Sequence, residues 1–448
     1  MATLSDLKAW YAQHAKQIER DYLTFLKIPS ISTDPQFKKE TVTAAHWVED
    51  YLKAIGFDTE LWETSRNPVV FASHLVDPHC PTVLIYHHYD VQPVDPLEKW
   101  KSPPFEPTLR EGKVYARGAS DNKGQCFATL TALKAVVGLL KNINVKIFIE
   151  GEEECGSEGA YEVLKSHQKE LKADYLLIVD AGLPAPHTPA ITMGLRGIIA
   201  MEVTCQNSAI DLHSGLHGGI ALNPNRALIQ MLAQLWDETG KVAIPGFYDE
   251  VESSDRLKGD VDRIYLQKQF GIQAFQGEGG YTLLESGTIR PTLEINGISG
   301  GYTGEGFKTV IPSVAKAKIS CRLVPRQNFE KIGKLVENHL RKIAPSGLEI
   351  EVSFEHGGEA FRTSGNTVIA KVCSEAYSEV FEKPCTEIFG GGSVPLVNEL
   401  SKVCGAEVAL IGVALDSDDF HAPNEHFGLD QLEYGFLTIG RILGRLAK

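Results

Sequence analysis

Histidines and carboxylates follow several of the apolar stretches that the sequence predicts to be buried strands. They are His88 and Asp90 shortly after TVLIY, Asp121 in RGASDNKG, Glu152, Glu153 and Glu154 after NVKIFIEG, Asp180 at the end of YLLIVD, and His421 after AEVALIGVAL. Open α/β sheets place their ligand sites at the carboxyl ends of their strands. We therefore expect these side chains to gather at one edge of a sheet and to form a site there.

Each of these residues, taken alone, also has an ordinary structural explanation. An HxD pair can be a polar strand end, Asp121 can be a helix N-cap, and three adjacent glutamates can be a solvated loop. Carboxylates this close repel one another, however, unless cations or protons compensate their charge. Nitrogen and oxygen ligands without a thiolate suit two borderline cations such as zinc, manganese or cobalt. The members of this ligand set are His88, Asp121, Glu154, Asp180 and His421.

A pair of cations divides the work between neighbouring carboxylates. One carboxylate must bridge the two ions at a separation of ~3.5–4 Å. Of two adjacent glutamates, one can be a ligand and the other a general base that takes a proton from the attacking water. Asp90 lies two residues after His88 in extended chain, so it shares a face with the histidine and can orient its ring. The side chain of His87 should point the opposite way.

A second group of candidates lies in the middle of the chain. His213 stands between two glycine-rich turns in IDLHSGLHGG, Arg322 interrupts the apolar strand KISCRLVP, and His356 precedes two glycines. These side chains can bind a carboxylate and an oxyanion, although an ordinary loop histidine or a surface arginine would look the same. FGGGSVP lacks the GK[ST] ending of a phosphate loop, so we interpret it as a tight turn in which Ser393 can bind a ligand.

The elements that must position these residues alternate between helix and strand. Up to residue 193, and again from residue 383, this alternation predicts a mostly parallel sheet covered by helices on both faces. Residues 194–382 follow the order strand–helix–strand–strand–helix–strand, which is typical of a ferredoxin-like module. Within them, residues 242–300 fit poorly, and we interpret them as a long insertion or lid loop. We thus predict an α/β domain, 1–193 and 383–448, interrupted by a smaller α+β domain, 194–382.

Composition excludes several classes of function. The formal net charge of −14 over 448 residues argues against binding to nucleic acid or to an anionic membrane. The eight cysteines are scattered without a CxxC pair, which indicates free thiols in a reducing compartment. Charged residues interrupt every apolar run near the N-terminus, and no segment reaches the ~20 apolar residues that span a bilayer. We therefore expect a cytoplasmic protein.

The motifs also occur in the order seen in a known protein family. They are HHYDVQP, RGASDNKGQ, EGEEECGSEG, VDAG, DLHSGLHGG, KTVIPS, CRLVP, HGG, GGGSVP and HAPNE. This series resembles the co-catalytic metallopeptidases of family M20, which group aminoacylases, glutamate carboxypeptidases, succinyl-diaminopimelate desuccinylase and the carnosinases. The motifs DVQP, DLHSG and HAPNE resemble the corresponding motifs in the branch that contains cytosolic non-specific dipeptidase and carnosinase. The resemblance implies a zinc-exopeptidase-like fold with an inserted ferredoxin-like lid that forms homodimers.

The resemblance also implies roles for the candidate residues. Two Zn²⁺ or Mn²⁺ ions per subunit would be held by His88, Asp121, Glu154, Asp180 and His421, with Asp121 bridging. Glu153 would be the catalytic base and would then protonate the leaving amine, and Asp90 would orient His88. The position of His213 implies a residue that reaches the partner's active site and stabilises the oxyanion. The carboxylate end of the substrate pocket would be lined by Thr309, Arg322, His356 and Ser393.

Two positions depart from the usual pattern of the family. His87 stands where a glycine usually precedes the ligand histidine, but the spacing to Asp90 still assigns His88 as the ligand. EGEEE leaves the glutamate register open by one residue, and placing the pair directly before CGS assigns Glu153 as the base and Glu154 as the ligand. The sequence therefore predicts metal-assisted amide hydrolysis of dipeptides or similar small substrates with a free C-terminal carboxylate.

Two other functions compete with this prediction. An N-acyl amino acid deacylase on the same scaffold would also bind a terminal carboxylate, so Arg322 does not separate the two activities. A non-catalytic binding protein would be expected to lack the base or a ligand, whereas all six of these positions are intact.

Overall fold

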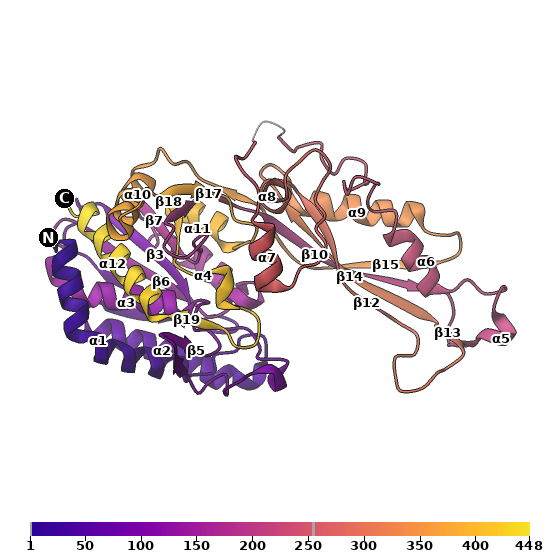
Figure 1. The fold of residues 1–448 in the computed structure, drawn as a ribbon, viewed down its shortest axis with the longest axis horizontal. Helices are drawn as coiled ribbons and strands as arrows, with labels where there is room; N and C mark the ends of the chain where they lie inside the picture. The colour runs from indigo at the N-terminus through magenta and orange to yellow at the C-terminus, as the bar shows by residue number, and fades with distance from the viewer. Residues whose placement is uncertain (1, 253–255) are drawn as a thin grey trace. The chain divides into compact units, whose positions relative to one another are not determined.

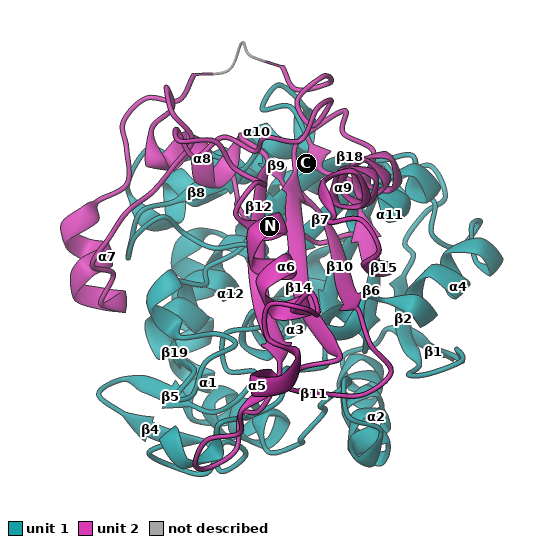
Figure 2. Cartoon of the chain, turned by 90° about the vertical axis from the view of Figure 1, so that its right-hand side faces the viewer, with its two compact units in different colours: residues 1–194, 363–388, 396–448 teal, residues 195–362, 389–395 magenta. Residues whose placement is uncertain are grey.

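The computed structural model describes residues 2–252 and 256–448, which form two compact units (Figure 2). Unit 1 comprises residues up to 194, 363–388 and 396–448, and unit 2 comprises residues 195–362 and 389–395. Residues 363–382 thus belong to unit 1, although the sequence placed them in the smaller domain, and residues 389–395 belong to unit 2, although the sequence placed them in the larger one. Residue 1 and residues 253–255, which fall in the predicted ranges 1–193 and 242–300, lie outside the described residues.

One large sheet forms the centre of unit 1. Among the described residues its strands follow the order β1 (Asp58–Trp62), β2 (Val69–His74), β6 (Asn144–Glu150), β3 (Thr82–His88), β7 (Tyr175–Val179), β18 (Glu407–Ile411), β8 (Ala190–Thr192) and β17 (Thr386–Ile388). The consecutive strands β6, β3, β7 and β18 are parallel. These strands are largely buried along their length, as expected for parallel strands covered on both faces. The predicted α/β fold is confirmed.

Helices cover both faces of this sheet. They are α1 (Leu4–Leu26), α2 (Lys38–Ala54), α3 (Lys123–Val136), α4 (Glu158–Ser166), α10 (Val368–Phe381), α11 (Leu396–Cys404) and α12 (Leu429–Leu446). Successive residues of β3 point to opposite faces. The Tyr86 hydroxyl donates to Glu150, which also accepts from Ser157 at the N-cap of α4, whereas His87 contacts Thr129 of α3. The first and last helices, α1 and α12, lie side by side (Figure 1).

The strand order explains why distant segments of unit 1 meet. Because β6, β3, β7 and β18 are neighbours and parallel, the loops after their carboxyl ends lie at one edge of the sheet. Those four loops contain the glutamate run, Asp90, Asp180 and the segment that leads to His421, and His88 is the last residue of β3.

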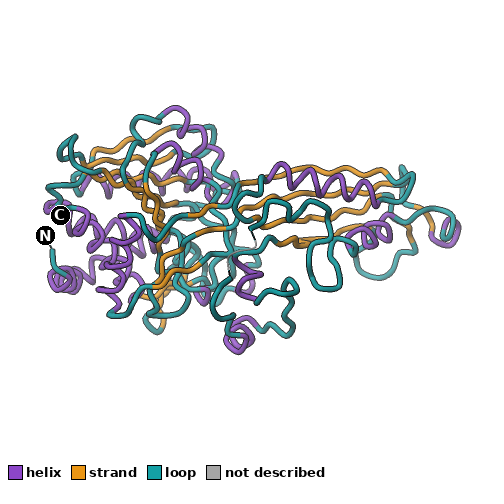
Figure 3. Tube along the Cα trace, turned by 90° about the horizontal axis from the view of Figure 1, so that it is seen from above, coloured by secondary structure: helices purple, strands orange, loops and turns teal. Residues whose placement is uncertain are grey.

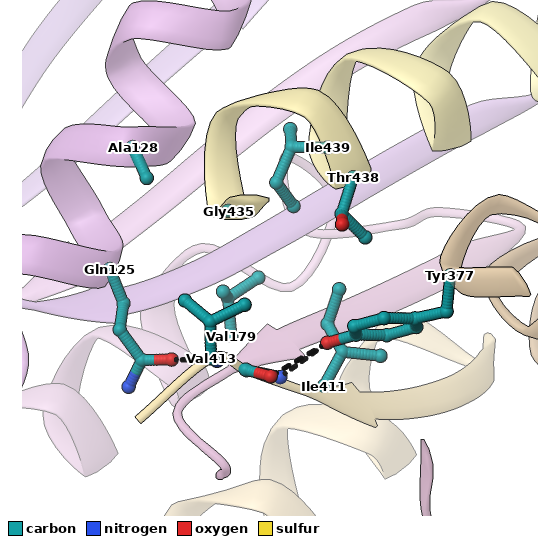
Figure 4. A pocket seen from close by; sticks show the side chains of 10 residues that line it. Gln125, Ala128, Val179, Tyr377, Ile411, Val413, Gly435, Thr438 and Ile439 are labelled. Atoms are coloured by element: carbon teal, nitrogen blue, oxygen red, sulfur yellow. Dashed lines mark hydrogen bonds between the residues drawn. The ribbon is translucent and has the colours of Figure 1, made fainter. Parts of the chain in front are cut away.

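The segment after β18 is fixed by polar side chains from three helices. Gln125 of α3 accepts a hydrogen bond from the Val413 amide at 2.9 Å, and Gln431 of α12 donates to the Val413 carbonyl at 2.8 Å. The Tyr377 hydroxyl of α10 donates to the Gly412 carbonyl and accepts from the Gly412 amide (Figure 4). A small cavity between these helices and β18 is lined mainly by apolar side chains. The chain therefore leaves β18 in a defined direction.

Unit 2 contains a four-stranded antiparallel sheet. Its strands follow the order β12 (Thr292–Gly300), β14 (Val314–Leu323), β10 (Gly197–Gln206) and β15 (Glu349–Gly358). The helices α6 (Pro224–Leu232) and α9 (Phe329–Ile343) pack on one face and share a core with the inward residues of β10 and β14. In chain order the elements are strand–helix–strand–strand–helix–strand, which is the predicted ferredoxin-like pattern.

The expectation of one long loop over residues 242–300 was wrong in part. This stretch contains α7 (Arg263–Phe270), α8 (Leu283–Thr288) and the whole of β12, although much of the rest is loop (Figure 3). β12 has a largely exposed burial pattern and contains two glycines, Gly297 and Gly300, so its sequence lacks the alternation that identifies a half-buried strand.

Two further expectations concern the whole chain. All eight cysteines are free thiols in the described structure. Over the same residues, we find no helix with the length and apolar character that crossing a membrane requires.

Candidate metal centre

Two groups of potential metal ligands meet at Asp121. His88, Asp121 and Asp180 form one group, and Asp121, Glu154 and His421 form the other, with the ligand atoms of each group within 4.8 Å of one another. His88 Nε2 lies 3.1 Å from Asp121 Oδ1, and His421 Nε2 lies 3.0 Å from Asp121 Oδ2. The two oxygens of one carboxylate thus face different histidines, which is the arrangement that a carboxylate bridging two cations requires.

Asp90 connects the histidine side of the site to the glutamate side. Its Oδ1 lies 3.3 Å from His88 Nδ1, and its Oδ2 accepts a hydrogen bond from the Ser32 hydroxyl at 2.6 Å. The backbone amides of Glu153 and Glu154 also donate to the Asp90 carboxylate, at 3.2 and 3.1 Å. Both His88 and Asp90 are fully buried. A carboxylate that holds the second ring nitrogen of a histidine fixes the orientation in which the first nitrogen meets a metal.

The three adjacent glutamates have three different surroundings. Glu152 accepts hydrogen bonds from the backbone amides of Asn67 and Gly159, at 2.8 and 2.6 Å. Glu154 Oε2 lies 2.7 Å from Gln92 Nε2 and 3.3 Å from His421 Nε2. The Glu153 side chain forms no hydrogen bond within the described part of the chain. The sequence alone leaves the roles of the glutamates in EGEEE open by one residue. In the structure, Glu152 is hydrogen-bonded to backbone amides and Glu154 belongs to a ligand group, whereas the Glu153 side chain has no hydrogen-bond partner among the described residues.

The loop that contains Asp121 is held by a residue from the end of the chain. The buried Glu425 carboxylate accepts hydrogen bonds from the amides of Gly118, Ser120 and Asp121 at 2.8–3.0 Å, and from Arg117 at 2.8 Å. The alternative interpretation of Asp121 as a helix N-cap was wrong, because the N-cap of α3 is the following residue, Asn122. Asp121 is thereby free to direct both oxygens at the histidines.

Several residues that support the site could not be assigned a role from the sequence. Glu425 was part of the HAPNE motif, and Gln92 was part of DVQP, yet neither received a role. Asn122, in SDNKG, donates a hydrogen bond to Asp180 Oδ1 at 2.7 Å. His87 is buried against α3, and burial lowers its pKa to about 3. The only sequence signal for these residues was their position inside a motif beside a candidate ligand.

The charges of the site suit cations. Burial raises the pKa of Glu154 to about 7, and Asp121 adds to this effect. Burial, with the nearby Glu154 carboxylate, also raises the pKa of Glu153 well above its usual range. Burial disfavours the charged form of His421, but hydrogen bonds to Asp121 and Glu154 outweigh it and raise that pKa to about 11. Carboxylates that resist ionisation and histidines that retain protons indicate a need for positive charge, which divalent cations on these nitrogen and oxygen donors would meet.

A separate cluster in unit 2 contains two of the predicted substrate residues. Arg322 donates to the Ser393 hydroxyl at 2.8 Å, and this hydroxyl donates to the Arg196 carbonyl. Arg196 in turn donates to the Gly391 carbonyl at 3.0 Å, which fixes the glycine-rich turn. Burial, together with the nearby Arg322, lowers the pKa of Arg196 to about 10. Within the described residues, neither guanidinium has a carboxylate in ion-pair distance.

Strand register places His356 on the same sheet face as Arg322. Arg322 of β14 lies opposite Ile198 of β10. His356 of β15 lies opposite Ala200, which is two residues further along β10. Residues two apart on a strand share a face. The neighbour of Arg322, Cys321, points instead into the core beneath α6 and α9. The face with Arg322 and His356 is therefore the one not covered by these helices.

His213 and Thr309 lie at the other end of the sheet of unit 2. His213, in β11 (Leu212–His213), pairs with Val310 of β13 (Val310–Ile311), just beyond the Val314 end of β14 (Figure 1). Both side chains are exposed. Arg322 is eight residues from Val314 along β14, and an extended strand of that length spans roughly 26 Å. One subunit therefore does not bring His213 and Thr309 to the Arg322–Ser393 pair.

Comparisons with known proteins agree with this geometry. The sequence profile of peptidase family M20/M25/M40 matches residues 84–445. A Cys-Gly metallodipeptidase of Candida albicans is 30% identical over 446 residues, covering 93% of this chain and 92% of that protein. A human Beta-Ala-His dipeptidase is 32% identical over 373 residues, covering 80% of this chain and 73% of that protein. The crystal structure of human carnosine dipeptidase 1 matches with a TM-score of 0.88 and 27% identity, covering 100% of this chain and 99% of that chain.

Proposed function

This chain belongs to peptidase family M20/M25/M40, and on that premise we propose that it is a two-metal dipeptidase. It hydrolyses the amide bond of dipeptides or similar small substrates that have a free C-terminal carboxylate. The observation that carries the proposal is the meeting of two ligand groups at the Asp121 carboxylate. The relatives from Candida albicans and human are dipeptidases by name, which favours this activity over an N-acyl amino acid deacylase.

We assign one Zn²⁺ or Mn²⁺ ion to each ligand group. His88 and Asp180 would hold the first ion, Glu154 and His421 would hold the second, and Asp121, which belongs to both groups, would be shared between them. These nitrogen and oxygen donors suit both metals. When bound, the cations polarise the scissile carbonyl and make the attacking water more acidic.

Glu153 is the general base of this proposal. Its carboxylate is buried among the ligand groups, adjacent to Glu154, and is not committed to another partner in the described structure. It takes a proton from the attacking water and transfers it to the nitrogen of the leaving amine. Asp90 fixes the orientation of the His88 ring. It also accepts hydrogen bonds from the backbone amides of Glu153 and Glu154, which fixes the position of Glu153.

Arg322 and Ser393 bind the substrate carboxylate, and His356 lies on the same face to contribute a further donor. A partly buried guanidinium without a carboxylate partner favours an anion, and its two N–H groups match the two oxygens of a carboxylate. This contact explains why an exopeptidase would reject internal peptide bonds. Arg196, which donates to the Gly391 carbonyl, holds the turn that positions Ser393.

We further propose that the enzyme is a homodimer in which His213 and Thr309 serve the partner's active site. A dipeptide is much shorter than the roughly 26 Å of strand that separates these residues from Arg322 in one chain. They can act on the same substrate only when they come from different subunits. There, the His213 imidazole stabilises the oxyanion of the tetrahedral intermediate.

The edge of the unit 2 sheet is the proposed dimer interface. β12 is an edge strand with nine residues and exposes Ile295 and Ile298, at 37% and 56%. An exposed, partly apolar edge strand is a ready template for pairing with another chain. Ile298→Lys should therefore convert dimers to monomers in sedimentation velocity, whereas Leu75→Lys, on exposed surface of unit 1, should not. A monomeric wild-type protein would contradict this assignment.

We place the enzyme in the cytoplasm, where its free cysteines would remain reduced.

Hydrolysis assays with metal-stripped full-length protein test the proposed activity. Dipeptides, matched N-acetyl amino acids and C-terminally amidated dipeptides are compared before and after addition of Zn²⁺ or Mn²⁺. We expect metal-dependent cleavage of free dipeptides, with little cleavage of the amidated compounds because they lack the carboxylate. Cleavage restricted to the acetylated compounds would assign the deacylase activity instead.

A further inference from the structure

His87 lies directly beside the proposed ligand His88 but faces away from the ligand groups. Its side chain is fully buried between β3 and α3. Its Nδ1 lies 2.8 Å from Asn122 Oδ1, and its Nε2 lies 2.9 Å from Thr129 Oγ1. Both ring nitrogens are thus engaged with uncharged side chains, and the mechanism proposed above uses neither.

Asn122 connects this histidine to the metal centre. It stands at the N-cap of α3, where an asparagine side chain ordinarily accepts a backbone hydrogen bond from the first helical turn. Its side chain forms no such cap bond in the described structure. Instead, its Nδ2 donates to the Val179 carbonyl at 2.9 Å and to Asp180 Oδ1 at 2.7 Å. The amide is therefore committed to the carboxylate of a proposed ligand.

The number of available hydrogens determines which atom donates in each of these hydrogen bonds. Both hydrogens of Asn122 Nδ2 are used, and rotating the amide would place its oxygen against two acceptors. Asn122 Oδ1 therefore accepts, and His87 Nδ1 must carry a hydrogen. A second hydrogen on Nε2 would create a buried cation with uncharged partners, which is costly. His87 Nε2 consequently accepts from the Thr129 hydroxyl at 2.9 Å, in preference to the Gln125 carbonyl, which lies 3.2 Å from the same hydroxyl.

We propose that His87, as the neutral Nδ1–H tautomer, is a positioning residue that orients Asp180 through Asn122. The donors run in one direction, from Thr129 to His87, from His87 to Asn122 and from Asn122 to Asp180. The inference rests on the proposed function, because Asp180 must be a metal ligand. The inferred role concerns one ligand group only. Among the described contacts, this series of hydrogen bonds ends at Asp180 and does not reach Glu154 or His421.

Zn²⁺ binding to the metal-stripped full-length protein tests this inference without relying on activity. His87→Leu removes the donor at similar volume, whereas His87→Asn retains an N–H at the position of Nδ1. We expect His87→Leu to weaken one of two Zn²⁺ dissociation constants by about 10- to 100-fold and to leave the other within about threefold, as for other residues that support a metal ligand. His87→Asn should restore most of the affinity. Competition with a fluorescent chelator measures both constants.

Thr129→Val is a second, milder variant that protects the test against misfolding of His87→Leu. Without the Thr129 hydroxyl, His87 Nε2 loses its donor while Nδ1 still donates to Asn122, so the same Zn²⁺ constant should weaken by a smaller factor. Histidine-selective ¹⁵N NMR of the metal-free wild type should show His87 protonated at Nδ1 and not at Nε2, and Thr129→Val should keep this tautomer. Protonation at Nε2 in the wild type would overturn the proposed order of donors.

The outcomes separate this inference from the proposed function. Wild-type protein that binds fewer than two Zn²⁺ ions would overturn both. Two wild-type ions with unchanged constants in His87→Leu would overturn the positioning role alone. Equal weakening of both constants, together with a lower unfolding temperature of the metal-free variant, would also overturn it, because a general structural defect would then explain the result.

Discussion

Apart from the exposed His421, the candidate residues of unit 1 are buried or half-buried and are held by several segments, whereas His213, Thr309 and His356 of unit 2 are exposed. His88 and Asp90 have no exposed surface, and the Asp121 loop is fixed by four donors to Glu425. His213 and Thr309, by contrast, lie on exposed loops and short strands. The cation-binding chemistry is thus preorganised within one chain. Under the proposed function, substrate recognition would depend on groups that await the substrate or a second subunit.

The largest expected effect follows from replacing Glu153, the proposed general base in unit 1. Glu153→Gln should lower kcat by about 10²- to 10⁴-fold, because it removes the group that accepts the proton of the water. Two metal ions per chain should still bind, as measured by elemental analysis.

Glu152→Gln is the matched control for that variant. Its carboxylate is tied to backbone amides rather than to the ligand groups, so its effect on kcat should be less than about tenfold. If Glu152→Gln were the inactive variant and Glu153→Gln the active one, the assignment of the register would be wrong.

The second effect tests whether the exposed unit serves a partner. His213→Ala should lower kcat by about 10²- to 10³-fold through loss of one oxyanion donor, whereas His217→Ala in the same segment should change it little. Mixing inactive His213→Ala with inactive Glu153→Gln should restore roughly a quarter of wild-type activity, since half of randomly paired dimers are hybrids with one intact site.

No recovery in that mixture, despite subunit exchange demonstrated by mass spectrometry, would place His213 in its own subunit's site. The contrast between a self-sufficient unit 1 and a partner-dependent unit 2 would then fail.

Arg322 gives the third effect. Arg322→Met should lower kcat/KM for free dipeptides by about 10- to 150-fold, the usual value of a hydrogen bond to a charged group. The loss should appear mainly in KM, and activity on amidated dipeptides should be unaffected. Arg326→Met, at an exposed surface ion pair with Glu252, is the control. Equal losses on free and amidated substrates would exclude Arg322 as the carboxylate anchor.

The smallest effect concerns protons at the preorganised site. Without metal, the pKa of His421 is raised to about 11 and that of Glu154 to about 7. At pH 7 the His421 ring therefore holds a proton that a cation must displace. Metal affinity should rise with pH, by about tenfold per pH unit for each proton released. Calorimetry in two buffers with different ionisation enthalpies measures these protons, and an affinity independent of pH from 6 to 8 would contradict the expectation.

Much of unit 1 could be predicted because its signals are local. Apolar strands such as TVLIY end directly at His88, and the helices between them have clear apolar patterns. Asn122 and Glu425 were missed because their roles arise from contacts between loops far apart in sequence, which no spacing reveals. β12 was missed because an exposed edge strand buries few side chains and so lacks alternation.

The boundary near residue 382 was also beyond local signals. α10 resembles any amphipathic helix in the sequence, and only its packing against α12 and β18 assigns it to unit 1. The glutamate register shows the same limit at the scale of one residue. EGEEE contains three candidates, and the backbone amides of Asn67 and Gly159 distinguish Glu152 from the other two.

The hydrogen bonds between Glu425 and the Asp121 loop have a consequence for the order in which the protein is synthesised and folds. His421 and Glu425 come long after the other ligand candidates in the sequence, the last of which is Asp180. During synthesis on the ribosome, N-terminal segments emerge and fold first. The nascent chain therefore exposes part of a ligand set long before the loop that completes it has been translated. The proposed metal centre is therefore complete only after residues 421–425 have been translated and have folded onto the Asp121 loop.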